Sequence, residues 1–171
     1  VDGFLNHRID TRLMRNIADE FGKHFNMDEV TMILTAEASG IALATMVAQR
    51  FDKPLLYAKK AKSDNIEGGL YQSDIHSYTY KKKVTLLVSK EWFSEKEKVL
   101  IIDDFMANGE AMRGLCDIVS AAGATLVGIG CAVEKGFQGG GDRLRAAGYN
   151  LRSLAIIESA EPGNVVFRDD D

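Results

Sequence analysis

The sequence has little of what marks secreted, disulfide-rich or membrane-bound proteins. Its only two cysteines, Cys116 and Cys131, lie in apolar stretches without the paired spacing of a disulfide framework. We therefore expect buried free thiols and a reducing compartment, most simply the cytoplasm. No apolar stretch approaches the length that spans a bilayer, and the first residues lack the basic segment and hydrophobic core of an export signal. The chain starts with Val1 rather than Met, so we expect a further N-terminal segment before it.

An excess of positive charge is also missing. The net charge is −4, which disfavours unspecific binding to nucleic acid or to an anionic membrane. A diphosphate ligand of this chain would therefore need a divalent cation. The chain lacks the Gly-rich Lys-Ser/Thr phosphate loop of nucleotide hydrolases, and its three histidines, His7, His24 and His76, have no metal-ligand spacing.

What is present indicates one soluble α/β domain over residues 1–171. Hydrophobic residues make up 46% of the chain and charged residues 27%, which is ordinary for a globular protein. Because predicted strands and helices alternate, we expect a mostly parallel sheet flanked by helices. The polar stretch 61–69 and the mixed stretch 71–80 predict a mobile loop or hairpin beside a site. Strands are expected at 31–36, 54–58, 84–88, 99–102, 125–133 and 151–157, and helices at 10–25, 41–50, 112–123 and 142–147.

Residues 99–112 carry the strongest functional signal. Val99 to Ile102 are aliphatic, as in a strand buried on both faces, and Asp103 and Asp104 follow where that strand is expected to end. Two carboxylates there can accept hydrogen bonds from the neighbouring hydroxyls of a ribose. The small residues of the 107–111 loop lead into a helix whose free amides favour a phosphate. The segment therefore predicts a site for a phosphorylated sugar.

This segment resembles the phosphoribosyl-diphosphate (PRPP) binding motif of type I phosphoribosyltransferases. It departs from the family at Asn108, which replaces Thr, and at Glu110 and Ala111, which replace small or Thr residues. A strand ending in Asp-Asp also occurs in the metal-binding strand of nucleotide hydrolases. The resemblance implies a small hood over the base, formed by N-terminal residues and residues after about 134. It implies that Asp103 and Asp104 are the catalytic residues and hold the ribose hydroxyls, directly or through Mg²⁺. The 5′-phosphate is assigned to Ala107, Asn108, Gly109, Glu110 and Ala111.

The resemblance also implies a diphosphate site and a closing loop. The diphosphate is assigned to a turn between a strand and a helix, formed by Glu37, Ala38, Ser39 and Gly40. Lys59 follows a predicted strand and would contact the diphosphate as a point charge, although a solvated lysine is equally expected there. Ser77 and Tyr78 occupy the place of the family's catalytic flexible loop, and a charged hairpin edge that discourages aggregation also fits that segment.

Three further residues indicate a purine. Phe137 offers a flat face for stacking, and Lys135 can donate to an exocyclic carbonyl. Together with Asn6 and the segments 37–41 and 102–109, they closely resemble bacterial xanthine phosphoribosyltransferases. That resemblance assigns base recognition to Asn6, Lys135 and Phe137. Hydrogen-bond donors on Asn6 and Lys135 suit xanthine, which carries two exocyclic oxygens. Hypoxanthine-guanine enzymes have an Asp at the position of Ala107, so the obvious general base is missing here.

The resemblance thus implies an enzyme of purine salvage. It would transfer the phosphoribosyl group of PRPP to xanthine, with Mg²⁺ bound alongside PRPP, and would act as a homodimer without nucleic-acid or membrane partners. Two alternatives stay open. One is a guanine or hypoxanthine phosphoribosyltransferase. The other is a non-catalytic regulator that senses PRPP; such regulators carry a DNA-binding winged helix upstream, and an acidic chain disfavours DNA.

Overall fold

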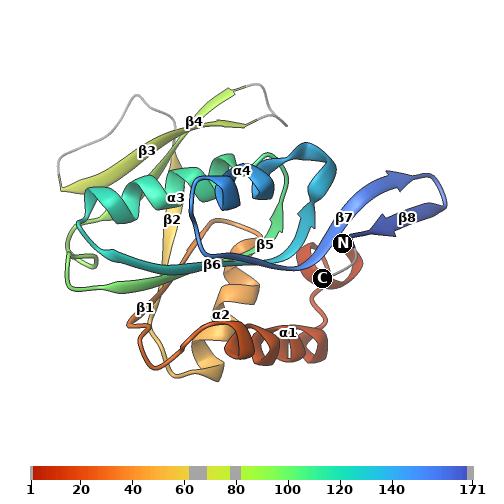
Figure 1. Ribbon diagram of the computed structural model, residues 1–171. Helices are drawn as coiled ribbons and strands as arrows, with labels where there is room; N and C mark the ends of the chain where they lie inside the picture. The colour runs from red at the N-terminus through yellow and green to blue at the C-terminus, as the bar shows by residue number, and fades with distance from the viewer. Residues whose placement is uncertain (1, 62–68, 78–81, 169–171) are drawn as a thin grey trace.

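The centre of the molecule is an eight-stranded sheet (Figure 1). The computed structural model describes residues 2–61, 69–77 and 82–168. Strand order is β3-β4-β2-β1-β5-β6-β7-β8. The neighbouring strands β2, β1, β5, β6 and β7 run parallel to one another, while β3 and β4 at one edge and β8 at the other pair antiparallel. The mostly parallel sheet is therefore confirmed. The strands are β1 (Met32–Ala36), β2 (Leu55–Ala61), β3 (Leu70–Ser77), β4 (Lys82–Ser89), β5 (Lys98–Met106), β6 (Thr125–Lys135), β7 (Leu151–Glu161) and β8 (Asn164–Phe167).

Helices cover both faces of this sheet, with α1 and α2 on one side and α3 and α4 on the other (Figure 1). The predicted cap of the first helix is confirmed, since the Asp10 carboxylate accepts hydrogen bonds from the amides of Arg12 and Leu13. None of the helices in the described part of the chain is long and apolar enough to cross a membrane. The helices are η1 (Asp2–Asn6), α1 (Thr11–His24), α2 (Gly40–Arg50), α3 (Glu110–Ala121), η2 (Gly136–Gln138) and α4 (Gly140–Ala146).

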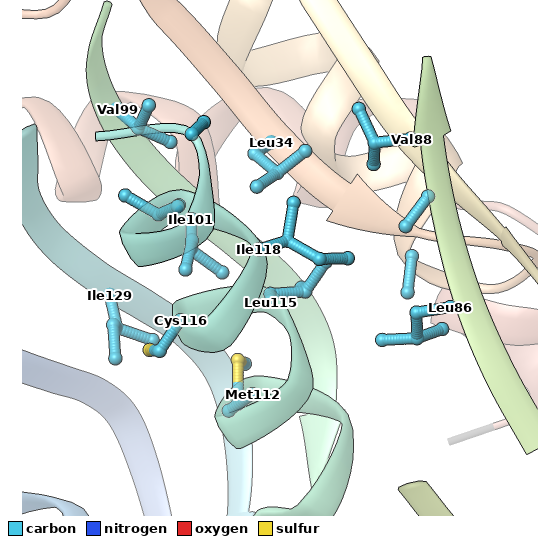
Figure 2. Packing of buried hydrophobic residues seen from close by; sticks show 14 of the residues in the cluster. Leu34, Leu86, Val88, Val99, Ile101, Met112, Leu115, Cys116, Ile118 and Ile129 are labelled. Carbon is cyan, nitrogen blue, oxygen red and sulfur yellow. The ribbon is translucent and has the colours of Figure 1, made fainter. Parts of the chain in front are cut away.

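The β5 strand contributes to the core on both sides of the sheet. Val99 and Ile101 pack in the cluster beneath α3, whereas Leu100 and Ile102 pack in the cluster beneath α1 and α2. Successive side chains of a strand point to opposite faces, so an all-aliphatic run is what a doubly covered strand requires. Figure 2 shows the first cluster, in which the apolar side of α3 lies against the sheet.

Several strands extend further than predicted, and the extensions of β5 and β2 affect the site. β5 continues to Met106, so Asp103 and Asp104 lie within the strand rather than after it. The reason is that β6 runs beside it as far as Lys135 and supplies backbone partners. β2 continues through Lys59 and Lys60 because β4 pairs antiparallel with that end of the strand.

The C-terminal part also differs from the prediction. β7 extends past residue 157 to Glu161, and a turn returns the chain as β8, which was not predicted. All four β8 residues are exposed, so the strand lacks the apolar alternation of a half-buried strand. The predicted hairpin at 71–80 is present as far as Ser77, which pairs with Lys82. The two short helices η1 and η2 were also missed.

Candidate active site

The acidic pair lies near the carboxyl end of the central strand β5. Asp103 and Asp104 are buried, with 7% and 2% of their surface exposed. The Asp104 amide donates to Asp103 Oδ1 at 3.0 Å, and the Ser39 hydroxyl donates to Asp104 Oδ1 at 2.9 Å. The acidic pair and the loop after β1, which the sequence predicted separately, are therefore in direct contact.

Close packing at the start of α2 explains why residue 40 is a glycine. A Cβ at Gly40 would overlap both Asp103 Oδ1 and Thr35 Oγ1. The first turn of α2 thus lies directly on the acid. Thr35 Oγ1 is buried there and has no hydrogen-bond partner in the described part of the structure. The Glu37–Ala38 peptide bond just before this turn is cis.

The surroundings of Asp103 favour its neutral form. Burial raises the pKa of Asp103 well above its usual range, and the charge of Asp104 raises it further, while the positive charge of Lys60 acts in the opposite direction. Hydroxyl donors or a cation brought beside the pair by a ligand would favour the charged form. The pair therefore has the properties of a binding site for a group that donates hydrogen bonds or carries positive charge.

The loop after β1 is also attached to the end of β2. Glu37 Oε1 accepts a hydrogen bond of 2.5 Å from the Lys60 amide, and the Glu37 amide donates to the Ala58 carbonyl at 3.0 Å. Lys59 and Lys60 are both exposed, but only the charge of Lys60 is among the main influences on Asp103. Sequence reasoning favoured Lys59, although neighbouring residues of a strand point to opposite faces. The diphosphate role of Lys59 stays a prediction.

The predicted phosphate loop forms the N-terminal cap of α3. Gly109 has φ 80°, a left-handed conformation that glycine adopts readily, and it directs the chain into the helix. Asn108 Oδ1 accepts a hydrogen bond of 3.2 Å from the Glu110 amide. Asn108, one of the residues that depart from the family motif, thus stabilises the turn into α3. The first amides of a helix have no partner within the helix, so this end of α3 presents donors that suit a phosphate.

The side chain of Glu110 is engaged elsewhere. Its carboxylate accepts from the His76 amide at 3.4 Å and pairs with Arg113 at 3.1 Å. Arg113 in turn donates to the Asp74 carbonyl of β3 at 3.0 Å. Glu110 therefore joins α3 to β3, and its part in phosphate binding stays a prediction. Ser77 ends β3, and Tyr78 lies outside the described residues.

The predicted base-binding residues lie on three elements, β6, η2 and η1. Lys135 ends β6, and its Nζ lies 4.9 Å from the centre of the Phe105 ring, a cation–π contact that the sequence did not reveal. Phe137 follows in η2 with 51% of its surface exposed, so its ring is accessible for stacking. Asn6 ends η1 and lines a surface cavity with Gly3, His7 and Arg8. Lys135 and Phe137 do not line that cavity.

Residues 2–61, 69–77 and 82–168 contain no cluster of three or more His, Cys, Asp or Glu side chains arranged to hold a metal ion. Hard cations such as Mg²⁺ prefer oxygen ligands, and the two carboxylates of the acidic pair are ligands of that kind.

Comparisons with known proteins place this chain in a family. Residues 5–155 match the family model described as the phosphoribosyl transferase domain. A xanthine phosphoribosyltransferase from Lachnoclostridium phytofermentans is 51% identical, and the alignment covers 99% of this chain and 89% of that protein. A xanthine phosphoribosyltransferase from Bifidobacterium longum is 50% identical over 98% of this chain and 89% of its own length.

Solved structures agree with this assignment. Adenine phosphoribosyltransferase from Trypanosoma brucei, in complex with AMP, pyrophosphate and ribose-5-phosphate, has a TM-score of 0.73 and 25% identity, covering 86% of this chain and 65% of that one. The enzyme from Giardia lamblia, complexed with 9-deazaadenine, shares the fold, with a TM-score of 0.74 at 21% identity over 86% of this chain and 80% of its own. The chain described here belongs to the phosphoribosyltransferase family.

Proposed function

We propose that this protein transfers the phosphoribosyl group of PRPP to xanthine, forming xanthosine 5′-monophosphate and releasing diphosphate. The observation that carries this proposal is the identity of about 50%, over almost the whole chain, to proteins named xanthine phosphoribosyltransferase. At that level the substrate of the relatives is the best guide to the substrate of this chain. The contacts around the acidic pair supply a site that suits the reaction.

In this proposal Asp103 and Asp104 hold the ribose hydroxyls. Ser39 fixes Asp104, and the loop 37–40 that contains it would receive the diphosphate at the start of α2. The 107–111 loop at the start of α3 would bind the 5′-phosphate through its amides. The Trypanosoma brucei relative was solved with pyrophosphate and ribose-5-phosphate, the two pieces that these loops would hold.

The reaction needs a purine nitrogen to attack the anomeric carbon as the bond to diphosphate breaks. The transition state has oxocarbenium character, so positive charge develops on the ribose beside Asp103 and Asp104. Carboxylates positioned there would stabilise that charge without reorganisation. The acidic pair would hold either the ribose hydroxyls or the Mg²⁺ that is bound with PRPP. That Mg²⁺ would supply positive charge to offset the charge of the leaving diphosphate. The protein's main contribution is then the relative placement of the two substrates.

Base recognition would come from donors that match the oxygens of xanthine. Lys135 can donate to an exocyclic oxygen, and Phe137, two residues later, can stack on the ring. Asn6 would donate from a hood made of the N-terminal residues and the segment after residue 134. The side chain of Ala107 is a methyl group and cannot accept a proton from the purine, so this position supplies no general base.

The setting that we propose is a homodimer in the cytoplasm, without nucleic-acid or membrane partners. Both cysteines are free and buried, which suits a reducing compartment. Exposed apolar side chains at Val165, Val166 and Phe167 offer surface that a second copy of the chain would cover.

The proposal is tested by incubating the protein with xanthine, PRPP and Mg²⁺ and measuring nucleotide and diphosphate by chromatography. We expect equal amounts of xanthosine monophosphate and diphosphate, and none when any one component is omitted. If PRPP binds but no purine yields a nucleotide, the result would refute the transferase and favour a regulator that senses PRPP.

A further inference from the structure

A fully buried carboxylate lies next to the predicted purine segment and has no part in the mechanism above. Glu134 is the penultimate residue of β6, and its side chain has no exposed surface. Arg145 of α4 holds it with two hydrogen bonds, of 2.7 and 3.1 Å, and the Ser153 hydroxyl donates to the same carboxylate. A buried charge persists only when its partners satisfy it, so this pair ties α4 firmly to β6.

The other side of α4 lies on the phosphate loop. A Cβ at Gly140 would overlap the Ala107 carbonyl and would lie 2.6 Å from the Gly109 nitrogen. Arg143 donates to the Asn108 carbonyl at 3.0 Å. Because these contacts are with backbone atoms, a shift of α4 would move the loop itself rather than a side chain.

The first turn of α4 also contacts Glu134 without intervening side chains. A Cβ at Gly141 would overlap the Glu134 carboxylate. Two successive glycines thus bring α4 into contact with the phosphate loop on one side and with the end of β6 on the other. Lys135, the residue after Glu134, is the predicted base-binding lysine.

We propose that Glu134 and Arg145 are positioning residues that hold α4 between the phosphate loop and the purine segment, so that binding of PRPP and binding of the purine both depend on this pair. This inference rests on the proposed function for the identity of the substrates. The arrangement of α4 itself is tested without them.

The test compares Arg145→Met and Glu134→Gln with Arg50→Met. Arg50 pairs with Asp19 at 2.5 Å on the surface between α2 and α1, so its replacement also removes an arginine from an ion pair, but away from the site. Steady-state kinetics give KM for PRPP and for xanthine separately from kcat. Hydrogen exchange followed by mass spectrometry gives the protection of the 107–112 amides in the absence of substrate.

We expect both variants of the pair to raise KM for PRPP and for xanthine by at least about tenfold, since small displacements of binding groups have large effects. The 107–112 amides should exchange faster, while Arg50→Met behaves as the wild type. Arg145→Lys keeps the charge but cannot form the two-point contact, so it should recover only part of the loss. If Arg145→Met fails to fold, Arg145→Lys takes its place in both measurements.

Unchanged exchange at 107–112, or a rise in KM for xanthine alone, would overturn the inference. A wild-type protein without transferase activity would refute the proposed function instead, and the exchange measurement would still decide whether the pair positions the loop.

Discussion

The hydroxyl of Ser39 donates a hydrogen bond of 2.9 Å to Oδ1 of Asp104, a residue 65 positions later in the chain. This contact joins the loop after β1 to the acidic pair of β5. The predicted diphosphate loop and the predicted ribose acids therefore have a fixed relative position before any substrate binds. Such preorganisation reduces the ordering that binding would otherwise require.

Replacing Ser39 with alanine should weaken PRPP binding without unfolding the protein. One hydrogen bond contributes about 0.5–1.5 kcal/mol, so we expect KM for PRPP to rise by roughly 2- to 13-fold. Thr45→Ala is a matched control, because its hydroxyl donates to the Ile41 carbonyl within α2 at 2.7 Å. The interpretation fails if both variants have the same KM for PRPP.

Replacing Asp103 with asparagine should stabilise the ligand-free protein relative to the wild type, by an amount that grows with pH, and should lower activity. Because burial and then Asp104 raise the pKa of Asp103, the folded state keeps a proton that the unfolded state releases. The stability that this group contributes is complete below the unfolded carboxyl pKa of about 3.9 and is lost as pH rises through the folded pKa. The neutral amide has no such loss.

Urea unfolding from about pH 4 to about pH 8 measures this effect. The free energy of unfolding of Asp103→Asn minus that of the wild type should grow with pH, whereas parallel curves would contradict the raised pKa. We expect kcat/KM to fall by roughly 10- to 100-fold, as for loss of a hydrogen bond to a charged group.

Replacing Gly140 with alanine should displace the phosphate loop. The added methyl group would meet backbone atoms of residues 107–109, which cannot move aside as a side chain can. We expect KM for PRPP to rise by at least about tenfold. Gly114→Ala is the control, since its methyl group would meet the side chains of Ile75 and Leu86 and would lower stability without touching the loop. Equal KM values for PRPP in the two variants would show that crowding alone explains the effect.

Replacing Lys135 with methionine should impair the purine and spare PRPP. Loss of a charged donor corresponds to a rise of roughly 10- to 100-fold in KM for xanthine. Phe105→Leu removes the ring 4.9 Å from the ammonium and should give a smaller effect on the same parameter. For each variant, varying xanthine at saturating PRPP gives KM for xanthine, and varying PRPP at saturating xanthine gives KM for PRPP. A larger rise in KM for PRPP than for xanthine would contradict the assignment of Lys135 to the purine site.

The sequence predicted most of the parallel core because local patterns decide it. The aliphatic run of β5 and the Asp10 cap of α1 are properties of neighbouring residues, and both are confirmed. β8 and the extended ends of β2 and β5 depend on backbone pairing with strands distant in the chain. Composition does not encode such pairing directly.

The same limit applies to the site. The acidic pair and the phosphate loop lie in one continuous segment and could be read together. The Ser39–Asp104 contact and the Lys135–Phe105 contact join segments that only the folded sheet brings together. The influence of the Lys60 charge on Asp103 likewise acts between two strands that are distant in the chain.

The central claim is that this site turns over xanthine in preference to other purines. The most direct measurement is kcat/KM for xanthine, guanine and hypoxanthine at saturating PRPP and Mg²⁺. We predict that xanthine exceeds the other two by at least about tenfold, because donors placed for a second exocyclic oxygen stay unpaired with a purine that lacks it. An equal or higher value for guanine or hypoxanthine would contradict the account.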